Sequence, residues 1–128
     1  MGTQDGGCLW GTMRFRLTGA PSFSVICHCR SCRKASGAPS VAWLTVPLRN
    51  FEILRGAPRS FVSSPGIVRT FCPTCGSPIT YATAESPDTI DLATALLDDA
   101  MAFPPDREIW LDHRLAWEPI DPTRTQCR

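Results

Sequence analysis

The chain has 128 residues, and 43% of them are hydrophobic, which is enough for a single domain with one core. Its 13 basic and 12 acidic residues give a formal net charge of +1, so no overall field favours nucleic acid or an anionic membrane surface. We therefore expect one domain over residues 1–128 and no nucleic-acid partner.

Hydrophobic and polar residues alternate along most of the chain, which is the pattern of strands with one buried face. In "MRFRL", for example, Met13, Phe15 and Leu17 share a face opposite two arginines. The 12 prolines and 9 glycines leave little room for long helices. The sequence predicts an all-β domain with short helical turns at 30–36 and near 96–101. Its expected strands are 13–17, 23–27, 41–46, 50–54, 60–63, 67–71, 78–82, 88–94 and 107–111.

No segment has the composition of a signal peptide or a membrane span. The N-terminal "MGTQDGG" is polar, and the apolar run "VAWLTVPL" is short and contains Pro47. We expect an unprocessed, soluble protein of the cytoplasm. Nothing in the sequence specifies an oligomeric state.

Seven cysteines raise the choice between disulfides and a metal site. Their odd number and their C-x-C and C-x-x-C spacings favour thiolates on a metal. The segment "CHCRSC" supplies Cys27, Cys29 and Cys32, and three protein ligands with a vacant fourth position are typical of catalytic zinc.

A second group of cysteines is split along the sequence. The knuckle "CPTCG" aims Cys72 and Cys75 at one ion and needs partners from elsewhere. Cys8, which precedes the first predicted strand, is available to join them. These spacings predict two metal sites of different kinds.

Four segments, "GGCLWGTMRF", "CHCRSCRKASGAP", "FCPTCGSPI" and "REIWLDHRLAWEP", together resemble the family of glutathione-dependent formaldehyde-activating enzymes, which includes the centromere-protein-V-like proteins. The resemblance runs from about residue 6 to about residue 119, which leaves 120–128 as a tail. It implies a small zinc-binding β domain in which two layers of sheet form a tent-like fold. It also implies a catalytic-type zinc on Cys27, Cys29 and Cys32, and a structural zinc on Cys8, Cys72 and Cys75.

The first of these segments departs from the family pattern. That pattern has two cysteines in C-x-C-G, whereas this chain has Trp10 at the second position, and its indole nitrogen cannot bind a metal. We therefore expect the second site to be empty, partly filled or completed by a weak ligand. Cys127 is the remaining cysteine, and its place in a polar tail disfavours it as the fourth ligand. We expect Trp10 to offset part of the loss by burying its ring against the core.

The resemblance implies combination of formaldehyde with glutathione, or of an aldehyde with a related small thiol, to give S-hydroxymethylglutathione or its analogue. The reverse reaction is that of a carbon–sulfur lyase. An open zinc could deliver a deprotonated thiol or polarise the aldehyde oxygen, and three thiolate ligands favour thiol delivery because they weaken the Lewis acidity of the ion. The alternative is a zinc-stabilised binding module of the family without this activity.

The polar residues beside the first cysteine cluster each have two interpretations. His28 could act as a base or a hydrogen-bond donor, but neighbouring residues point in opposite directions, which predicts that it faces solvent. The basic residues Arg30, Arg33 and Lys34 could bind the carboxylates of a glutathione-like ligand, or could form a solvated basic turn.

The remaining candidates have simpler interpretations. We expect Trp43, Trp110 and Trp117 in the core or at its rim rather than as platforms for a ligand. The pair Asp98–Asp99 predicts a turn. The pair Asp112–His113 lacks a nucleophile in its sequence context, so it does not indicate a catalytic triad.

Overall fold

The computed structural model describes residues 2–128, which form two β-sheets. The smaller sheet contains β1 (Thr3–Gly7), β2 (Arg14–Thr18) and β5 (Phe51–Arg55). The larger sheet has eight strands in the spatial order β11 (Thr125–Gln126), β10 (Arg107–Ile109), β3 (Phe23–Cys27), β4 (Val41–Pro47), β9 (Thr89–Ala93), β8 (Pro78–Thr83), β7 (Ile67–Phe71) and β6 (Arg59–Ser64). The predicted all-β class is confirmed.

Helical segments within residues 2–128 are short. The helix α1 (Arg30–Ser36) has the predicted bounds and ends at Gly37, whose φ of 72° is favourable only for glycine. The helical turn expected near 96–101 lies earlier, at Thr94–Leu96, because Leu97 bridges to Gly6 and the Asp98 amide donates to the Asp5 carbonyl, so the helical hydrogen bonds end there. No helix in this part of the chain has the length and apolarity needed to cross a bilayer. The 3-10 turns are η1 (Leu48–Asn50), η2 (Thr94–Leu96) and η3 (Leu111–His113).

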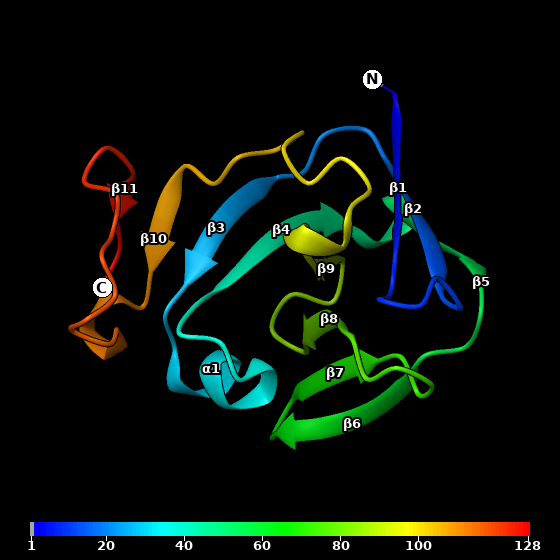
Figure 1. Cartoon of the computed structure of the whole chain (residues 1–128), viewed down its shortest axis with the longest axis horizontal. Helices are drawn as coiled ribbons and strands as arrows, with labels where there is room; N and C mark the ends of the chain where they lie inside the picture. Colours follow the sequence, from blue (N-terminus) through cyan, green and yellow to red (C-terminus); the bar gives the residue numbers. More distant parts are fainter. Residues whose placement is uncertain (1) are drawn as a thin grey trace.

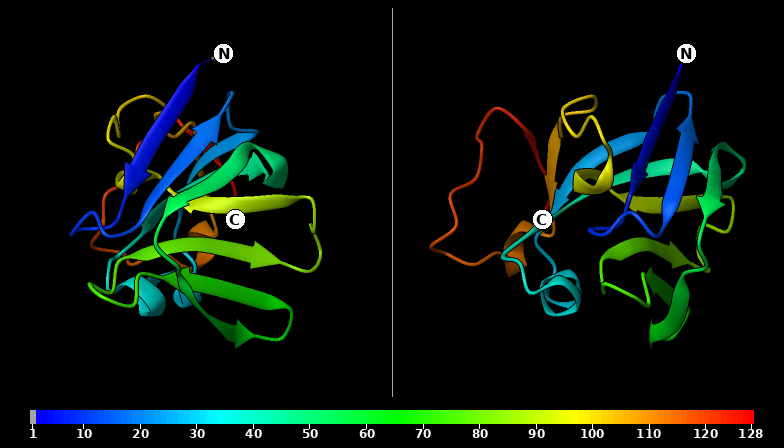
Figure 2. Two further views of the ribbon diagram at one scale, coloured as in Figure 1. Left: turned by 90° about the vertical axis from the view of Figure 1, so that its right-hand side faces the viewer. Right: turned by 45° about the vertical axis from the view of Figure 1, so that its right-hand side comes forward.

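The hydrophobic core lies between the smaller sheet and the middle of the larger one (Figure 2). Phe15 and Leu17 of β2 are fully buried against Leu44 and Val46 of β4 and Leu92 of β9. Because successive side chains of a strand point to opposite faces, the residues between these apolar positions face away from the core. The larger sheet therefore has a second face that is free to carry a site.

The larger sheet is curved, and α1 lies on its inner side (Figure 1). The helix follows directly from β3 and approaches the hairpin of β6 and β7, so it partly closes the hollow of the sheet. Its first residues are thereby held opposite the second face of strands β4, β8 and β9.

The sequence pattern did not predict β1, because "TQDGG" has no apolar alternation. This strand forms by pairing antiparallel with β2 over its whole length. Gly6 permits the pairing, since a Cβ added there would lie 2.4 Å from the Leu96 carbonyl oxygen and 2.6 Å from Phe15 Cζ. The short β11, which pairs parallel with β10, was also not predicted.

We expect Gly6→Ala to lower the free energy of unfolding by about 1–3 kcal/mol, because the added methyl group overpacks the junction of β1 with η2 and β2. Thermal unfolding followed by circular dichroism measures this change. Gly2→Ala is the matched control, since a Cβ at Gly2 meets no atom within 4 Å. Equal stability of the two variants would contradict the packing described here.

Candidate metal centre and adjoining cavity

The first cysteine cluster lies where β3 runs into α1. Cys27 is the last residue of β3, Cys29 is the N-cap of α1, and Cys32 lies in its first turn. The Cys29 Sγ accepts a hydrogen bond of 3.2 Å from the Cys32 amide, which fixes the loop between them. All three sulfur atoms lie within 4.8 Å of one another. Tetrahedral zinc with bonds of about 2.3 Å requires thiolates roughly 3.8 Å apart, so this donor set fits one ion.

The environment of these thiols favours the ionised form of Cys29 alone. Hydrogen bonds with Cys29 and Cys32, together with burial, raise the pKa of Cys27, and the pKa of Cys32 is raised as well. Hydrogen bonds with Cys27 and then Cys32 lower the pKa of Cys29 to about 2. A buried guanidinium, that of Arg69 on β7, donates from Nη2 to the Cys32 Sγ at 3.6 Å. A fixed cation beside the cluster partly balances the negative charge that three thiolates would concentrate there.

His28 is buried and only 1% exposed, so the prediction that it faces solvent is wrong. It does point away from the neighbouring thiols, but the C-terminal segment covers that side of β3, because β10 pairs parallel with β3. His28 Nε2 and Glu108 Oε1 are 2.5 Å apart, and Arg124 Nη1 donates to Glu108 Oε2 at 2.6 Å. The Glu118 carboxylate lies 3.4 Å from His28 Nδ1. This buried network connects the cysteine loop to the C-terminal segment.

A cavity of about 570 Å³ adjoins the first cysteine cluster on the second face of the larger sheet. All three cysteines contribute to its wall. Aromatic rings of Phe23, Trp43 and Tyr81 line it together with the cationic side chains of Arg69 and Arg107. Its size and its mixture of apolar and charged groups suit a small anionic ligand.

One row of side chains crosses the floor of this cavity from strand to strand. The register places Thr45 of β4 opposite Asp91 of β9, Asp91 opposite Tyr81 of β8, and Tyr81 opposite Arg69 of β7. Thr45 Oγ1 donates to Asp91 Oδ1 at 2.7 Å, and the Arg69 guanidinium lies 4.9 Å from the centre of the Tyr81 ring. Burial raises the pKa of Asp91 and the pKa of Tyr81. Sequence reasoning missed this row, although Thr45 and Asp91 each stand between two apolar residues of their strands.

The basic residues proposed from the sequence separate in the structure. Arg30 lines the cavity, whereas Arg33 donates to the His113 carbonyl and Lys34 faces a second, shallow hollow beside β6. Arg107 on β10 was not predicted, and it lies in the cavity wall with its guanidinium 5.0 Å from the centre of the Phe23 ring.

The three tryptophans and the two acidic pairs considered in the sequence lie in different parts of the structure. Trp43 is buried and packs 6.1 Å from Tyr81, Trp110 is half exposed at the rim of the cavity, and Trp117 is exposed outside it. Asp98 and Asp99 form the predicted turn. His113 lines the cavity, but its neighbour Asp112 pairs with Arg128.

The second cysteine cluster consists of Cys8, Cys72 and Cys75, whose sulfur atoms also lie within 4.8 Å of one another. The Thr12 hydroxyl lies 3.4 Å from the sulfur atoms of both Cys8 and Cys72. Hydrogen bonds with Thr12 and Thr74 lower the pKa of Cys72 to about 5. Three thiols with a hydroxyl at their edge can hold a metal ion, but the residues that the structure describes add no fourth thiol.

Trp10 does not bury its ring, because 67% of it is exposed, so that prediction is wrong. The Gly11 amide donates to the Cys8 carbonyl, and this turn places Leu9 and Trp10 at its outer tip. Cys127 is not part of either cluster, and its backbone instead pairs with Glu108 and Leu111. The second cluster therefore gains neither packing from the ring of Trp10 nor a fourth ligand from Cys127.

Comparison with known proteins agrees with this architecture. The profile of the family described as "Glutathione-dependent formaldehyde-activating enzyme" matches residues 3–113. A search of curated proteins finds no significant match. A crystal structure of a Rhodobacter sphaeroides protein superposes with a TM-score of 0.63, over 79% of this chain and 97% of that chain, at 22% sequence identity, which shows a shared fold. Because the family profile spans most of its length, the chain belongs to the family of glutathione-dependent formaldehyde-activating enzymes.

Proposed function

We propose that the protein is a zinc-dependent enzyme of the carbon–sulfur lyase type, which combines formaldehyde with glutathione to give S-hydroxymethylglutathione. The observation that carries this proposal is the placement of Cys27, Cys29 and Cys32 in the wall of a cavity with cationic and aromatic side chains. A closed structural site would not need such a cavity. Family membership supports the same reaction class.

Cys27, Cys29 and Cys32 would hold the zinc ion, which supplies an open coordination position where a thiol loses its proton at neutral pH. Arg69 positions Cys32 through the contact between its Nη2 and the thiol sulfur. His28 and Glu108 hold the backbone of the loop from the opposite side. These contacts fix the ligands before substrate arrives, so little reorganisation is required on binding.

The charged residues of the cavity match the charges of glutathione. Arg30, Arg107 and Asp91 line the cavity, where the two arginines would bind its two carboxylates and Asp91 would bind its ammonium group. Phe23 and Trp43 provide apolar surface that displaces water from the thiol end. The tripeptide would thus be oriented by its charged ends with its sulfur toward the cysteine loop.

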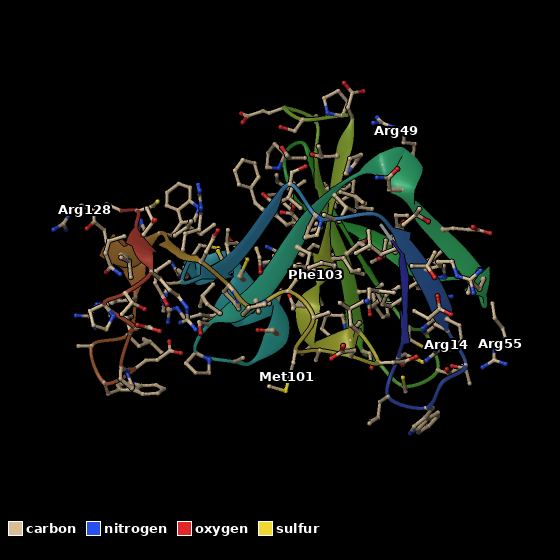
Figure 3. The ribbon with its side chains drawn as sticks, turned by 90° about the horizontal axis from the view of Figure 1, so that it is seen from above. Arg14, Arg49, Arg55, Met101, Phe103 and Arg128 are labelled. Carbon is tan, nitrogen blue, oxygen red and sulfur yellow. The ribbon has the colours of Figure 1, made fainter. Side chains whose placement is uncertain are left out.

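The runner-up function is a zinc-stabilised binding module. A module for nucleic acid requires a gathered basic surface, but Arg14 and Arg55 lie at one end of the molecule and Arg128 at the other (Figure 3). Arg14 and Arg128 are also paired with Asp98 and Asp112. These three arginines therefore give no support to a nucleic-acid module.

We expect Cys29→Ser to lose the zinc of the first cluster and to abolish the enzyme-dependent exchange between glutathione and S-hydroxymethylglutathione. Metal analysis measures the first effect, and exchange spectroscopy with ¹³C-formaldehyde measures the second. Cys127→Ser is the matched control, because this cysteine lies outside both clusters. Wild-type protein that contains zinc and binds glutathione without accelerating the exchange would instead support the binding module.

We expect Arg107→Gln to raise the glutathione concentration needed for half-maximal rate by about 10-fold, because one charge-assisted contact to a carboxylate contributes roughly 1.5 kcal/mol. The half-saturating concentration of 2-mercaptoethanol, which lacks carboxylates, should not change. Steady-state rates with both thiols measure this difference. An equal effect on the two thiols would show that Arg107 acts on the fold of the cavity instead.

We expect Trp10→Cys to raise the zinc content toward two ions per chain and to raise the melting temperature in zinc-replete buffer, because a fourth thiolate closes the second cluster. The exposed ring of Trp10 contributes little packing, so its loss costs little stability. Trp10→Ser removes the same ring without adding a thiol and serves as the control. Two tightly held zinc ions in the wild-type protein would contradict the expected weakness of this site.

A further inference from the structure

Tyr81 lies beside the first cysteine cluster, and nothing in the reaction described so far uses it. Its ring packs against the small hydrophobic cluster that contains Cys27, Cys32 and Trp43. It also lines the cavity, and it is half-buried there. A ligand whose sulfur reaches the cysteine loop would therefore pass close to this ring.

The position of the ring is fixed from two sides. The Arg69 guanidinium lies 4.9 Å from the ring centre and donates to the Cys32 sulfur, so one side chain contacts both groups. On another side, the Trp43 and Tyr81 ring centres are 6.1 Å apart. Tyr81 is thus held in a fixed relation to the thiols, as a group that acts on bound substrate must be.

The hydroxyl group of Tyr81 has no structural partner. It makes no hydrogen bond within residues 2–128, and it is not among their fully buried unpartnered polar atoms, so its oxygen is accessible, and Tyr81 lines the cavity. A phenol with an ordinary pKa of about 10 is neutral at neutral pH. The wall of the cavity therefore contains a neutral O–H donor on a ring that packs against the cluster with Cys27 and Cys32.

Two neighbouring groups, Arg69 and Asp91, are less suited to give a proton to an oxygen atom. Arg69 is a permanent cation that donates hydrogen bonds but does not release a proton. Asp91 already accepts a hydrogen bond from Thr45. It also lies one strand further than Tyr81 from β7, the strand whose Arg69 contacts Cys32. The other titratable groups that line the cavity are Arg30, Arg107, His113 and the three cysteines.

We propose that Tyr81 is a catalytic residue, which donates its phenolic proton to the aldehyde oxygen during addition of the thiol. This inference rests on the function proposed above. The thiol first releases its proton to solvent, and its sulfur forms a bond to the aldehyde carbon while the carbon–oxygen π bond breaks. That electron pair moves to the oxygen, which takes the proton of Tyr81, and water in the open cavity returns a proton to the phenolate. The sum is one thiol and one aldehyde giving one S-hydroxymethyl adduct.

The test is Tyr81→Phe, which removes the hydroxyl and keeps the ring against Arg69 and Trp43. We expect kcat for the glutathione–formaldehyde exchange to fall by about 10²-fold, as on loss of one donor to a developing oxyanion. Zinc content, the dissociation constant of glutathione measured by calorimetry, and the melting temperature should be unchanged. The control is Thr80→Val, which removes a hydroxyl from the opposite face of β8, where it pairs with Thr70. This control should retain the wild-type kcat.

The outcomes separate this inference from the proposed function. Wild-type kcat in Tyr81→Phe would overturn the role of Tyr81 and leave the proposed function intact. A parallel loss of glutathione affinity or zinc would also overturn it, because the hydroxyl would then act in binding or in the metal site. A wild-type protein that does not accelerate the exchange would overturn the proposed function, and the inference with it.

Discussion

The candidate site depends on the register of four antiparallel strands, β4, β9, β8 and β7. In this register the side chains of Thr45, Asp91, Tyr81 and Arg69 meet in one row on the second face of the sheet. A slip of one residue would move every such side chain to the other face. The register of β4 and β9 is held by the core, since Leu44, Val46 and Leu92 are fully buried on the opposite side of these two strands. Each contributes roughly 1.5–3 kcal/mol of hydrophobic free energy, so packing on one face places the polar groups on the other.

The buried network around His28 connects the cysteine loop to a segment far along the sequence. Glu108 is buried with His28 and is also bound by Arg124, so the charge of the carboxylate has partners on both oxygens. Loss of one partner from such a buried group typically costs about 3–5 kcal/mol. The network therefore holds β10 against β3. It also fixes the backbone that presents Cys27 and Cys29 to the cavity.

Local patterns in the sequence were sufficient for the strands of the core and for the two cysteine clusters. Alternation predicted β3 and β7 with their observed ends, and cysteine spacing indicated which thiols would gather. The polar row was not predicted, because it depends on cross-strand register rather than on neighbours in the sequence. The burial of His28 was missed for the same reason, since residues from β10 onward cover it. Trp10 was placed incorrectly because ring size favours burial, whereas the turn that begins at Cys8 directs the ring outward.

The two cysteine clusters differ in how they are connected along the chain. Cys27, Cys29 and Cys32 are close in sequence, so even an unfolded chain can gather them around a metal ion. Cys8 meets Cys72 and Cys75 only after β1, β2 and the end of β7 have assembled. A ligand stabilises the native state only by the difference between its affinities for folded and unfolded chains. A metal ion at the local cluster would therefore stabilise the native state by less than its full binding energy. An ion at the other cluster, where only Cys72 and Cys75 are close in sequence, would transfer a larger share of its binding energy to the native state.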